Sequence, residues 1–223
     1  MPRRTRAKDL RRKVASRPER KTVVIFCEGE ASEPDYINAL KRLPEVRGNT
    51  SINIEIATER GVPLPLVRRA VERACDDEVD ECWCVFDVEW PKHHPNLDEA
   101  VRLAQEHGIR LAISNPCFEL WLILHFEEQT AFLSTADAER KSHKLDGRAG
   151  KRIDAAAYMD RRTTATVRAL RLSRRHEKNS TIFPRQSVFV DERPSCRDRT
   201  ARVIRCCGGT RSRMSRLRSG TAP

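Results

Sequence analysis

The chain has 223 residues, a length that suits one domain of ordinary size, and a formal net charge of +11. It has no apolar run long enough to cross a bilayer and no N-terminal apolar run of the signal-peptide kind, so we expect a cytoplasmic protein without a membrane segment. The eight cysteines include no C-x-x-C pair, which argues against a zinc site.

The basic residues are concentrated at the two ends of the chain. Residues 1–22 contain ten Lys or Arg against two acidic residues, and residues 185–223 contain ten against three. We therefore expect a basic, flexible arm at 1–21, a folded domain at 22–184 and an irregular basic tail at 185–223. Such ends can neutralise the phosphates of DNA or RNA, or simply remain solvated.

The first strand is expected at residues 22–27, an almost wholly apolar and β-branched run. Ser32 with Asp35 three residues later has the form of a capping box, so a helix is expected to begin there, with Pro34 in its first turn. A second strand and a second helix are expected at 52–57 and 66–74.

The alternation continues with a strand at 82–88 and a helix at 97–107, which Asn96 would cap and Gly108 would end. A fourth strand at 109–113 precedes a helix with Asn115 at its N-cap and Pro116 in its first turn. Residues 134–175 have a polar helical pattern. Together these elements predict an α/β domain with a mostly parallel sheet, flanking helices and a small C-terminal helical appendage.

Acidic residues follow two of these strands, where the sites of open parallel sheets collect. Glu28 and Glu30 come directly after the first strand, and Asp87 and Glu89 end the third. Residues two apart in a strand project to the same side, so Asp87 and Glu89 are expected to converge. Carboxylates from neighbouring strand ends can hold Mg²⁺ or Mn²⁺ for phosphoryl transfer, with Glu28 as a base. The alternative is that these acids are solvated loop residues.

The segment after Asn115 is apolar on nearly all sides and is therefore expected to be a buried helix. Glu119 on this helix must find a partner, which would be an internal arginine or the metal site. His125 on the same helix is expected to be a satisfied core residue. His93 and His94 lie between prolines after Glu89, where they could touch a phosphate or a metal, although histidines in such loops are more often exposed to solvent.

Four motifs in this order resemble the RloB-like family, and they extend over about residues 21–184: VVIFCEGEASEPDY, CWCVFDVEW, AISNPCFELWLILHF and RRHEKNSTIFP. Members of this family are often encoded beside restriction-modification genes, or beside an ATPase partner in phage-abortive systems. The resemblance implies a Toprim-like, Rossmann-like fold in which Glu28 is the first acid and Asp87 with Glu89 forms the D-x-D element. Glu89 replaces the second aspartate, and its longer side chain would shift the geometry of a metal site.

The acids and the resemblance predict a metal-dependent nuclease or nuclease-like effector of antiphage defence that cuts DNA or RNA, transfer RNA included. Glu28, Asp87 and Glu89 would be metal ligands and, with Glu119, catalytic residues, whereas Glu30 and Asn115 would orient them or contact substrate. The alternative is a non-catalytic, Toprim-like partner that docks on a defence ATPase and regulates it.

The end of the chain departs from the family pattern. Residues from about 185 onward lack the asparagine-proline-serine segment and the final amphipathic helix of the family, and their composition is rich in Arg, Ser, Cys and Gly. We hypothesise that this terminus is out of frame, in which case its positive charge carries no information about nucleic acids.

Overall fold

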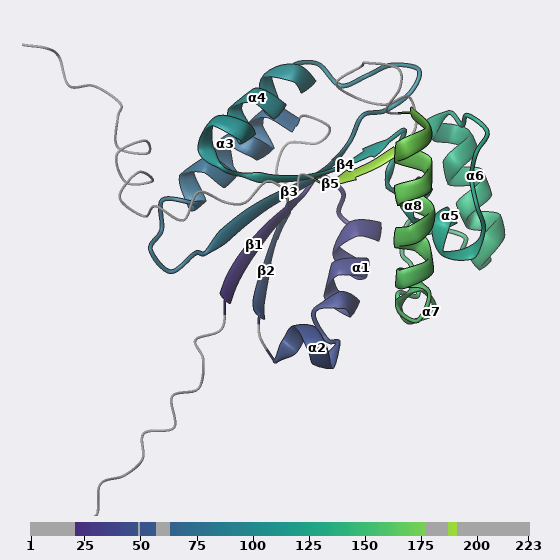
Figure 1. Cartoon of the computed structure of the whole chain (residues 1–223), viewed down its shortest axis with the longest axis horizontal. Helices are drawn as coiled ribbons and strands as arrows, with labels where there is room; N and C mark the ends of the chain where they lie inside the picture. The colour runs from purple at the N-terminus through teal and green to yellow at the C-terminus, as the bar shows by residue number, and fades with distance from the viewer. Residues whose placement is uncertain (1–20, 49, 57–62, 177–186, 191–223) are drawn as a thin grey trace, which may run out of the picture.

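A five-stranded sheet forms the centre of the molecule, in the order β2-β1-β3-β4-β5 (Figure 1). The structure is a computed structural model that describes residues 21–48, 50–56, 63–176 and 187–190. β1 (Lys21–Cys27), β2 (Thr50–Ile56), β3 (Glu81–Asp87) and β4 (Arg110–Asn115) are parallel to one another. This arrangement confirms the predicted α/β, Rossmann-like fold with a mostly parallel sheet.

The fifth strand lies in a segment whose sequence predicts an irregular tail. β5 (Ser187–Val190) pairs with β4 in the antiparallel direction and forms one edge of the sheet. The predictions for the N-terminal arm at residues 1–20 and for the altered terminus at residues 191–223 lie outside the described residues.

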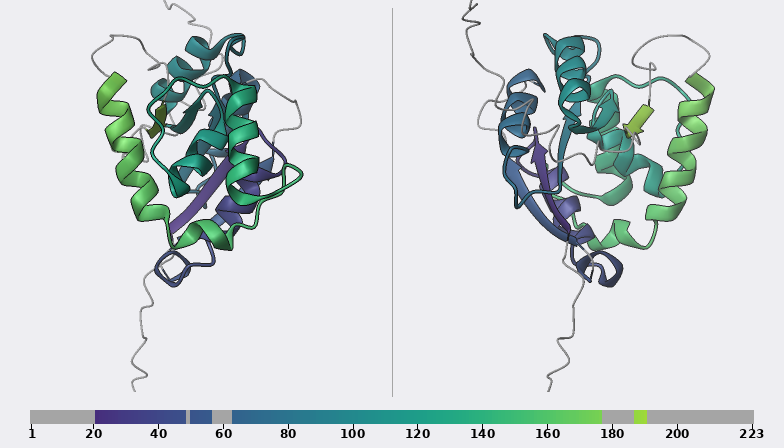
Figure 2. Two further views of the ribbon diagram at one scale, coloured as in Figure 1. Left: turned by 90° about the vertical axis from the view of Figure 1, so that its right-hand side faces the viewer. Right: turned by 60° about the vertical axis from the view of Figure 1, so that its left-hand side comes forward.

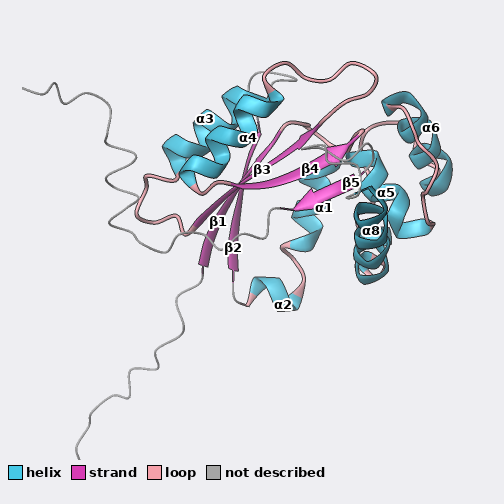
Figure 3. Ribbon diagram, turned by 45° about the horizontal axis from the view of Figure 1, so that its top comes forward, coloured by secondary structure: helices cyan, strands magenta, loops and turns pink. Residues whose placement is uncertain are grey.

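Helices cover both faces of the sheet (Figure 3). On one face lie α3 (Pro63–Arg73) and α4 (Leu97–His107), whose apolar sides close the main core. The opposite face is covered by α1 (Ser32–Leu40), which leads into the short α2 (Pro44–Arg47). Each face is apolar because both sides of these parallel strands are buried. The core on the first face is centred on Val24, Phe26, Val67, Phe86 and Ala104. The core on the second face is centred on Cys27, Ile37 and Val85.

The remaining helices gather beside β4 and β5, and α8 lies along the edge of this group in both views of Figure 2. They are α5 (Phe118–Phe126), α6 (Thr135–Asp146), α7 (Ala156–Met159) and α8 (Arg162–His176). α5 is buried, as predicted, and α8 packs on it through Ala165, Ala169 and Leu172. The predicted helical appendage therefore shares an apolar core with α5.

His125 is the satisfied core residue that the sequence predicted. Its Nε2 lies 3.1 Å from the hydroxyl of Tyr36, and its Nδ1 lies 2.8 Å from the carbonyl oxygen of Trp121. Burial lowers the pKa of His125 to about 4. None of the helices in the described part of the chain combines the length and hydrophobicity that a bilayer crossing requires.

Two of the predicted helix caps are wrong, although α1 begins at Ser32 as predicted. Ala31 is the N-cap of α1, and the hydroxyl of Ser32 donates instead to the carbonyl oxygen of Lys151 at 2.8 Å, so the capping box does not form. Asn115 is the last residue of β4, a cis peptide joins it to Pro116, and Cys117 is the N-cap of α5.

The limits of α4 follow the prediction more closely. Asn96 occupies its N-cap position without a side-chain capping hydrogen bond, and Gly108 follows its last residue with φ +67°. A left-handed residue after a helix is where glycine is favoured.

Candidate active site at the carboxyl ends of the strands

A cavity of about 540 Å³ opens where β1 and β3 end. Its walls carry two basic residues, Lys151 and Arg152, and seven acidic residues: Glu28, Glu30, Glu33, Asp87, Glu89, Glu119 and Glu139. All five acids singled out in the sequence therefore line one cavity, which we call the acidic cavity. Asn115, the other predicted site residue, is buried at the end of β4 and does not line it.

Glu28 and Asp87 are brought together by the pairing of their strands. β1 and β3 are adjacent and parallel, with Cys27 opposite Val85, so the residues that follow meet at the same edge. The carboxylate Oε2 of Glu28 accepts a hydrogen bond from the backbone N–H of Asp87 at 3.1 Å. The side chain of Glu28 thus lies across the end of β3.

His94 contacts the same carboxylate, which the sequence did not reveal. Its Nε2 lies 3.0 Å from Oε1 of Glu28, and the two side chains are only 13% and 14% exposed. The backbone N–H of His94 donates to the carbonyl oxygen of Val88 at 3.3 Å, which holds the loop against the end of β3. The expectation of a solvent-exposed histidine at this position was wrong.

Asp87 occupies the most buried position in the acidic cavity. Its Oδ1 is inaccessible to solvent and accepts no hydrogen bond from the described residues. Burial raises the pKa of Asp87 well above its usual range, and the charges of Glu33, Glu28 and Glu119 raise it further. A carboxylate in such surroundings either keeps its proton or requires a cation.

Glu33 is a further site residue that sequence reasoning missed. It lies in the first turn of α1 and is buried, with its carboxylate folded over Gly29. A Cβ at position 29 would lie 2.3 Å from Oε2 of Glu33, so the carboxylate can approach the backbone this closely only because Gly29 has no side chain. Burial raises the pKa of Glu33 to about 7, and the charges of Glu119 and Glu28 contribute to this shift.

Glu119 satisfies both alternatives considered for it, because it lines the acidic cavity and has an internal arginine partner. One guanidinium nitrogen of Arg148 lies 3.6 Å from its Oε1, and the hydroxyl of Ser32 donates to the same oxygen at 3.5 Å. The side chain of Arg148 is 7% exposed and also pairs with Asp146. Arg148 therefore links the loop after α6 to this wall of the cavity.

Glu89 reaches the cavity in a different way from the one predicted. β3 ends at Asp87, and Glu89 adopts φ 65°, so the two side chains do not share a strand face. The backbone N–H of Glu89 donates to the carbonyl oxygen of Pro116 at 2.9 Å, which helps to hold this conformation. A left-handed backbone at a residue other than glycine costs about 1–3 kcal/mol and is found preferentially at functional sites.

The donor chemistry of the acidic cavity fits a hard dication, since carboxylate oxygens are the ligands that Mg²⁺ and Mn²⁺ prefer. The buried and unpartnered Oδ1 of Asp87 is the atom that most clearly requires one. Within the described residues, however, no three His, Cys, Asp or Glu side chains already form a coordination shell. The carboxylates would have to turn towards an ion to hold it.

A family model described as RloB-like protein matches residues 23–197 of the chain. The match contains β2 to β5, most of β1 and every acid of the acidic cavity, and it continues past residue 184, the domain end that the sequence predicts. No curated protein matches the chain, and no solved structure matches it.

Proposed function

Because the chain belongs to the RloB-like family and gathers its acids around one cavity, we propose that it is a metal-dependent nuclease, or nuclease-like effector, of antiphage defence. Its substrate would be a phosphodiester of DNA or RNA, transfer RNA included, and it would act in the cytoplasm, with an ATPase encoded nearby as a partner. The observation that carries the proposal is the buried Oδ1 of Asp87, which has no hydrogen-bond partner among the described residues and is surrounded by other carboxylates.

Glu28, Asp87 and Glu89 are the residues that would hold Mg²⁺ or Mn²⁺. When bound, such an ion supplies a nucleophilic water at neutral pH and stabilises negative charge on a phosphate. Glu28 is fixed by the backbone of Asp87 and by His94, so its carboxylate is held in one place as ligand or base. Glu33, whose pKa burial raises to about 7, can accept or release a proton near neutral pH.

The two basic residues of the acidic cavity can attract phosphate. Lys151 and Arg152 line the cavity together with the acids. Ser32 connects the two groups, because its hydroxyl contacts both the backbone of Lys151 and the carboxylate of Glu119. A nucleic-acid phosphate in the cavity would therefore meet cationic side chains as well as carboxylates.

A second candidate function is the non-catalytic partner of a defence ATPase. Two observations favour it: Glu28 is already engaged by His94 and by the backbone of Asp87, and the described residues contain no ready coordination shell. In this case the fold would serve as a scaffold, and the acids as a regulatory or structural feature.

Cleavage assays on purified protein separate the two candidates. Labelled plasmid, single strands and transfer RNA are incubated with Mg²⁺ or Mn²⁺, with and without the ATPase encoded nearby, and Glu28→Gln is compared with Glu72→Gln. Glu72 lies on the exposed side of α3, so its variant is a control for the loss of one carboxylate. Cleavage that Glu28→Gln abolishes and Glu72→Gln retains supports the nuclease. No cleavage under any condition, with no metal-dependent change in melting temperature, supports the scaffold.

A further inference from the structure

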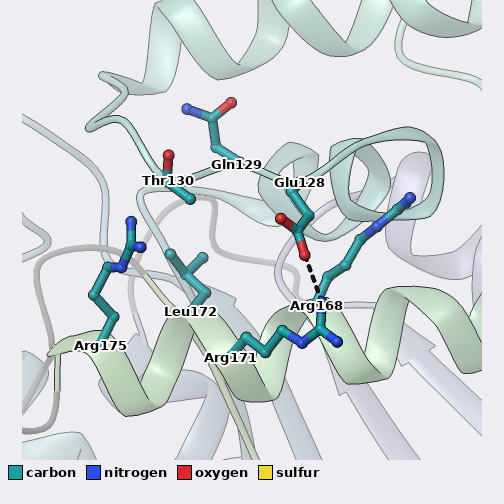
Figure 4. A pocket seen from close by; sticks show the side chains of 7 residues that line it. All are labelled: Glu128, Gln129, Thr130, Arg168, Arg171, Leu172 and Arg175. Atoms are coloured by element: carbon teal, nitrogen blue, oxygen red, sulfur yellow. Dashed lines mark hydrogen bonds and ion pairs between the residues drawn. The ribbon is translucent and has the colours of Figure 1, made fainter.

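A second cavity lies between α8 and the segment that follows α5 (Figure 4). Its volume is about 180 Å³, and it shares no lining residue with the acidic cavity. Three of its lining residues, Arg168, Arg171 and Arg175, come from α8. Their spacings of three and four residues place them on one side of the helix. We call this cavity the arginine pocket.

The charge of the arginine pocket is strongly positive. α8 carries five arginines and no acidic residue between Arg162 and His176. Glu128 is the one acid among the residues that line the pocket, against three guanidinium groups. Because arginine stays protonated at any physiological pH, this positive charge is permanent.

The three arginines differ in how firmly they are held. Arg168 donates to the carbonyl oxygen of Leu124 at 2.8 Å, which fixes its guanidinium at the end of α5. Arg171 pairs with Glu128 at 2.8 Å, but the two side chains are 68% and 54% exposed. Such an exposed pair contributes about 0–1 kcal/mol, so an anionic ligand can compete for Arg171. Figure 4 shows Arg175 across the pocket, with no bond to the other lining residues.

The size of the pocket and its donors indicate the ligand. Guanidinium groups bind phosphate oxygens through two parallel hydrogen bonds. Cavities that enclose a whole small molecule usually measure about 300–1,000 Å³ and are mainly apolar. A pocket of about 180 Å³ lined by three arginines suits one phosphate group of a larger molecule.

The arginine pocket and the acidic cavity are connected by a short stretch of chain. Thr130 lines the first and Thr135 lines the second, so their Cα atoms lie at most about 18 Å apart. Successive phosphates of one strand in a duplex advance by about 3.4 Å along the axis. Over a distance of this size, a strand with one phosphate in the acidic cavity could reach the arginine pocket with a phosphate about five or six nucleotides away.

From this geometry we infer that Arg168, Arg171 and Arg175 form a phosphate-binding pocket for the backbone of the nucleic-acid strand whose phosphodiester lies in the acidic cavity. The inference rests on the proposed function for the identity of the strand. The pocket binds without reading sequence, because its guanidinium groups contact phosphate and its lining residues include no aromatic side chain.

Binding in EDTA tests the inference without any cleavage step. Anisotropy of a labelled single-stranded oligonucleotide is measured over a series of salt concentrations for wild type, for Arg171→Ala/Arg175→Ala and for Arg102→Ala/Arg174→Ala. The control pair removes the same charge from exposed positions on α4 and α8 that do not line the pocket. Arg168 is left intact because its hydrogen bond supports the end of α5, and melting temperatures confirm that all variants are folded.

We expect the pocket pair to weaken binding about tenfold and to reduce the slope of log Kd against log salt by about 1.4, as the loss of two phosphate contacts to a single strand requires. The control pair should weaken binding less than about threefold. Equal losses in the two pairs would mean diffuse attraction and would overturn the pocket. Displacement of the oligonucleotide by a nucleoside 5′-monophosphate at the same concentration as the oligonucleotide would also overturn the inference, because it would show a site for free phosphates.

The two proposals fail in different ways. If wild type cleaves no substrate but binding still depends on the pocket pair, the nuclease proposal falls and the phosphate pocket stands. If wild type cleaves nucleic acid and the pocket pair binds as tightly as wild type, the phosphate pocket falls and the nuclease proposal stands.

Discussion

The carboxylate of Glu28 and the backbone N–H of Asp87 are joined by a hydrogen bond of 3.1 Å. This bond links the ends of two neighbouring parallel strands through one side chain. The position of Glu28 therefore depends on the pairing of β1 with β3, and its other oxygen lies 3.0 Å from His94. Substitutions of Glu28 can separate the effect of its charge from the effect of its hydrogen bond to Asp87.

Glu28→Gln keeps an oxygen that can accept the hydrogen bond of Asp87 but removes the charge, whereas Glu28→Ala removes both. In EDTA we expect Glu28→Gln to stay within about 1 kcal/mol of wild type, and Glu28→Ala to lose about 1–3 kcal/mol because the N–H of Asp87 is left without its acceptor. We expect Mg²⁺ to raise the melting temperature of wild type, and both variants to lose this rise. An unchanged rise in Glu28→Gln would show that this carboxylate is not a ligand.

Gly29→Ala tests the contact between the first loop of the acidic cavity and Glu33. The added Cβ would lie within 2.6 Å of three carboxyl atoms of Glu33, so the side chain must move. We expect a loss of about 1–3 kcal/mol in stability, typical of overpacking, and a fall in cleavage of about 10²-fold because the carboxylate is displaced. Gly150→Ala is the control, since its added Cβ meets no atom within 4 Å. Equal behaviour of the two variants would refute the contact.

The parallel sheet and the meeting of Glu28 with Asp87 could be predicted from the sequence. Strands buried on both faces leave continuous apolar runs, and these placed the four parallel strands to within two residues at each end. Parallel neighbours end at the same edge, so acids after β1 and β3 had to lie near each other. The position of the candidate site therefore follows from local sequence and one rule of topology.

The other residues around the acidic cavity depend on contacts between distant parts of the chain. An acid in the first turn of a helix is ordinary, because it favours the helix dipole, and Glu33 becomes unusual only when tertiary packing buries it against Gly29. Ser32 gave a false capping signal because its hydroxyl is used by Lys151, far along the chain. His94 and Arg148 likewise have no local pattern that would reveal their contacts with Glu28 and Glu119.

Arg148→Met is expected to destabilise the protein strongly. The side chain of Arg148 is 7% exposed and faces the carboxylates of Asp146 and Glu119, so its removal leaves buried charge without a cation. The expected loss is about 3–5 kcal/mol in urea unfolding. Arg152→Met is the control, because its partner is Asp35 but its own side chain is 77% exposed, and it should lose less than about 1 kcal/mol. Similar losses in the two variants would contradict the buried role of Arg148.

The pH dependence of stability should carry the signature of Glu33. Burial raises the pKa of this carboxyl from 4.5 to about 7, so the folded chain keeps a proton that the unfolded chain releases between these values. The contribution of Glu33 to the free energy of unfolding is therefore fully present below pH 4.5. As the pH rises to about 7, this contribution falls by up to about 3 kcal/mol. His125, whose pKa burial lowers to about 4, acts in the opposite direction.

Comparison with Glu33→Gln separates the two contributions, because His125 is present in both proteins. Urea unfolding in EDTA at intervals from pH 4.5 to 8 should show Glu33→Gln gaining stability relative to wild type as pH rises, with the gain complete above about pH 7. Gly29→Ala should show part of the same gain, since displacement of Glu33 towards solvent lowers its pKa. A difference between Glu33→Gln and wild type that stays constant over this range would mean that Glu33 is ionised throughout, and that the acidic cavity already stabilises its charge.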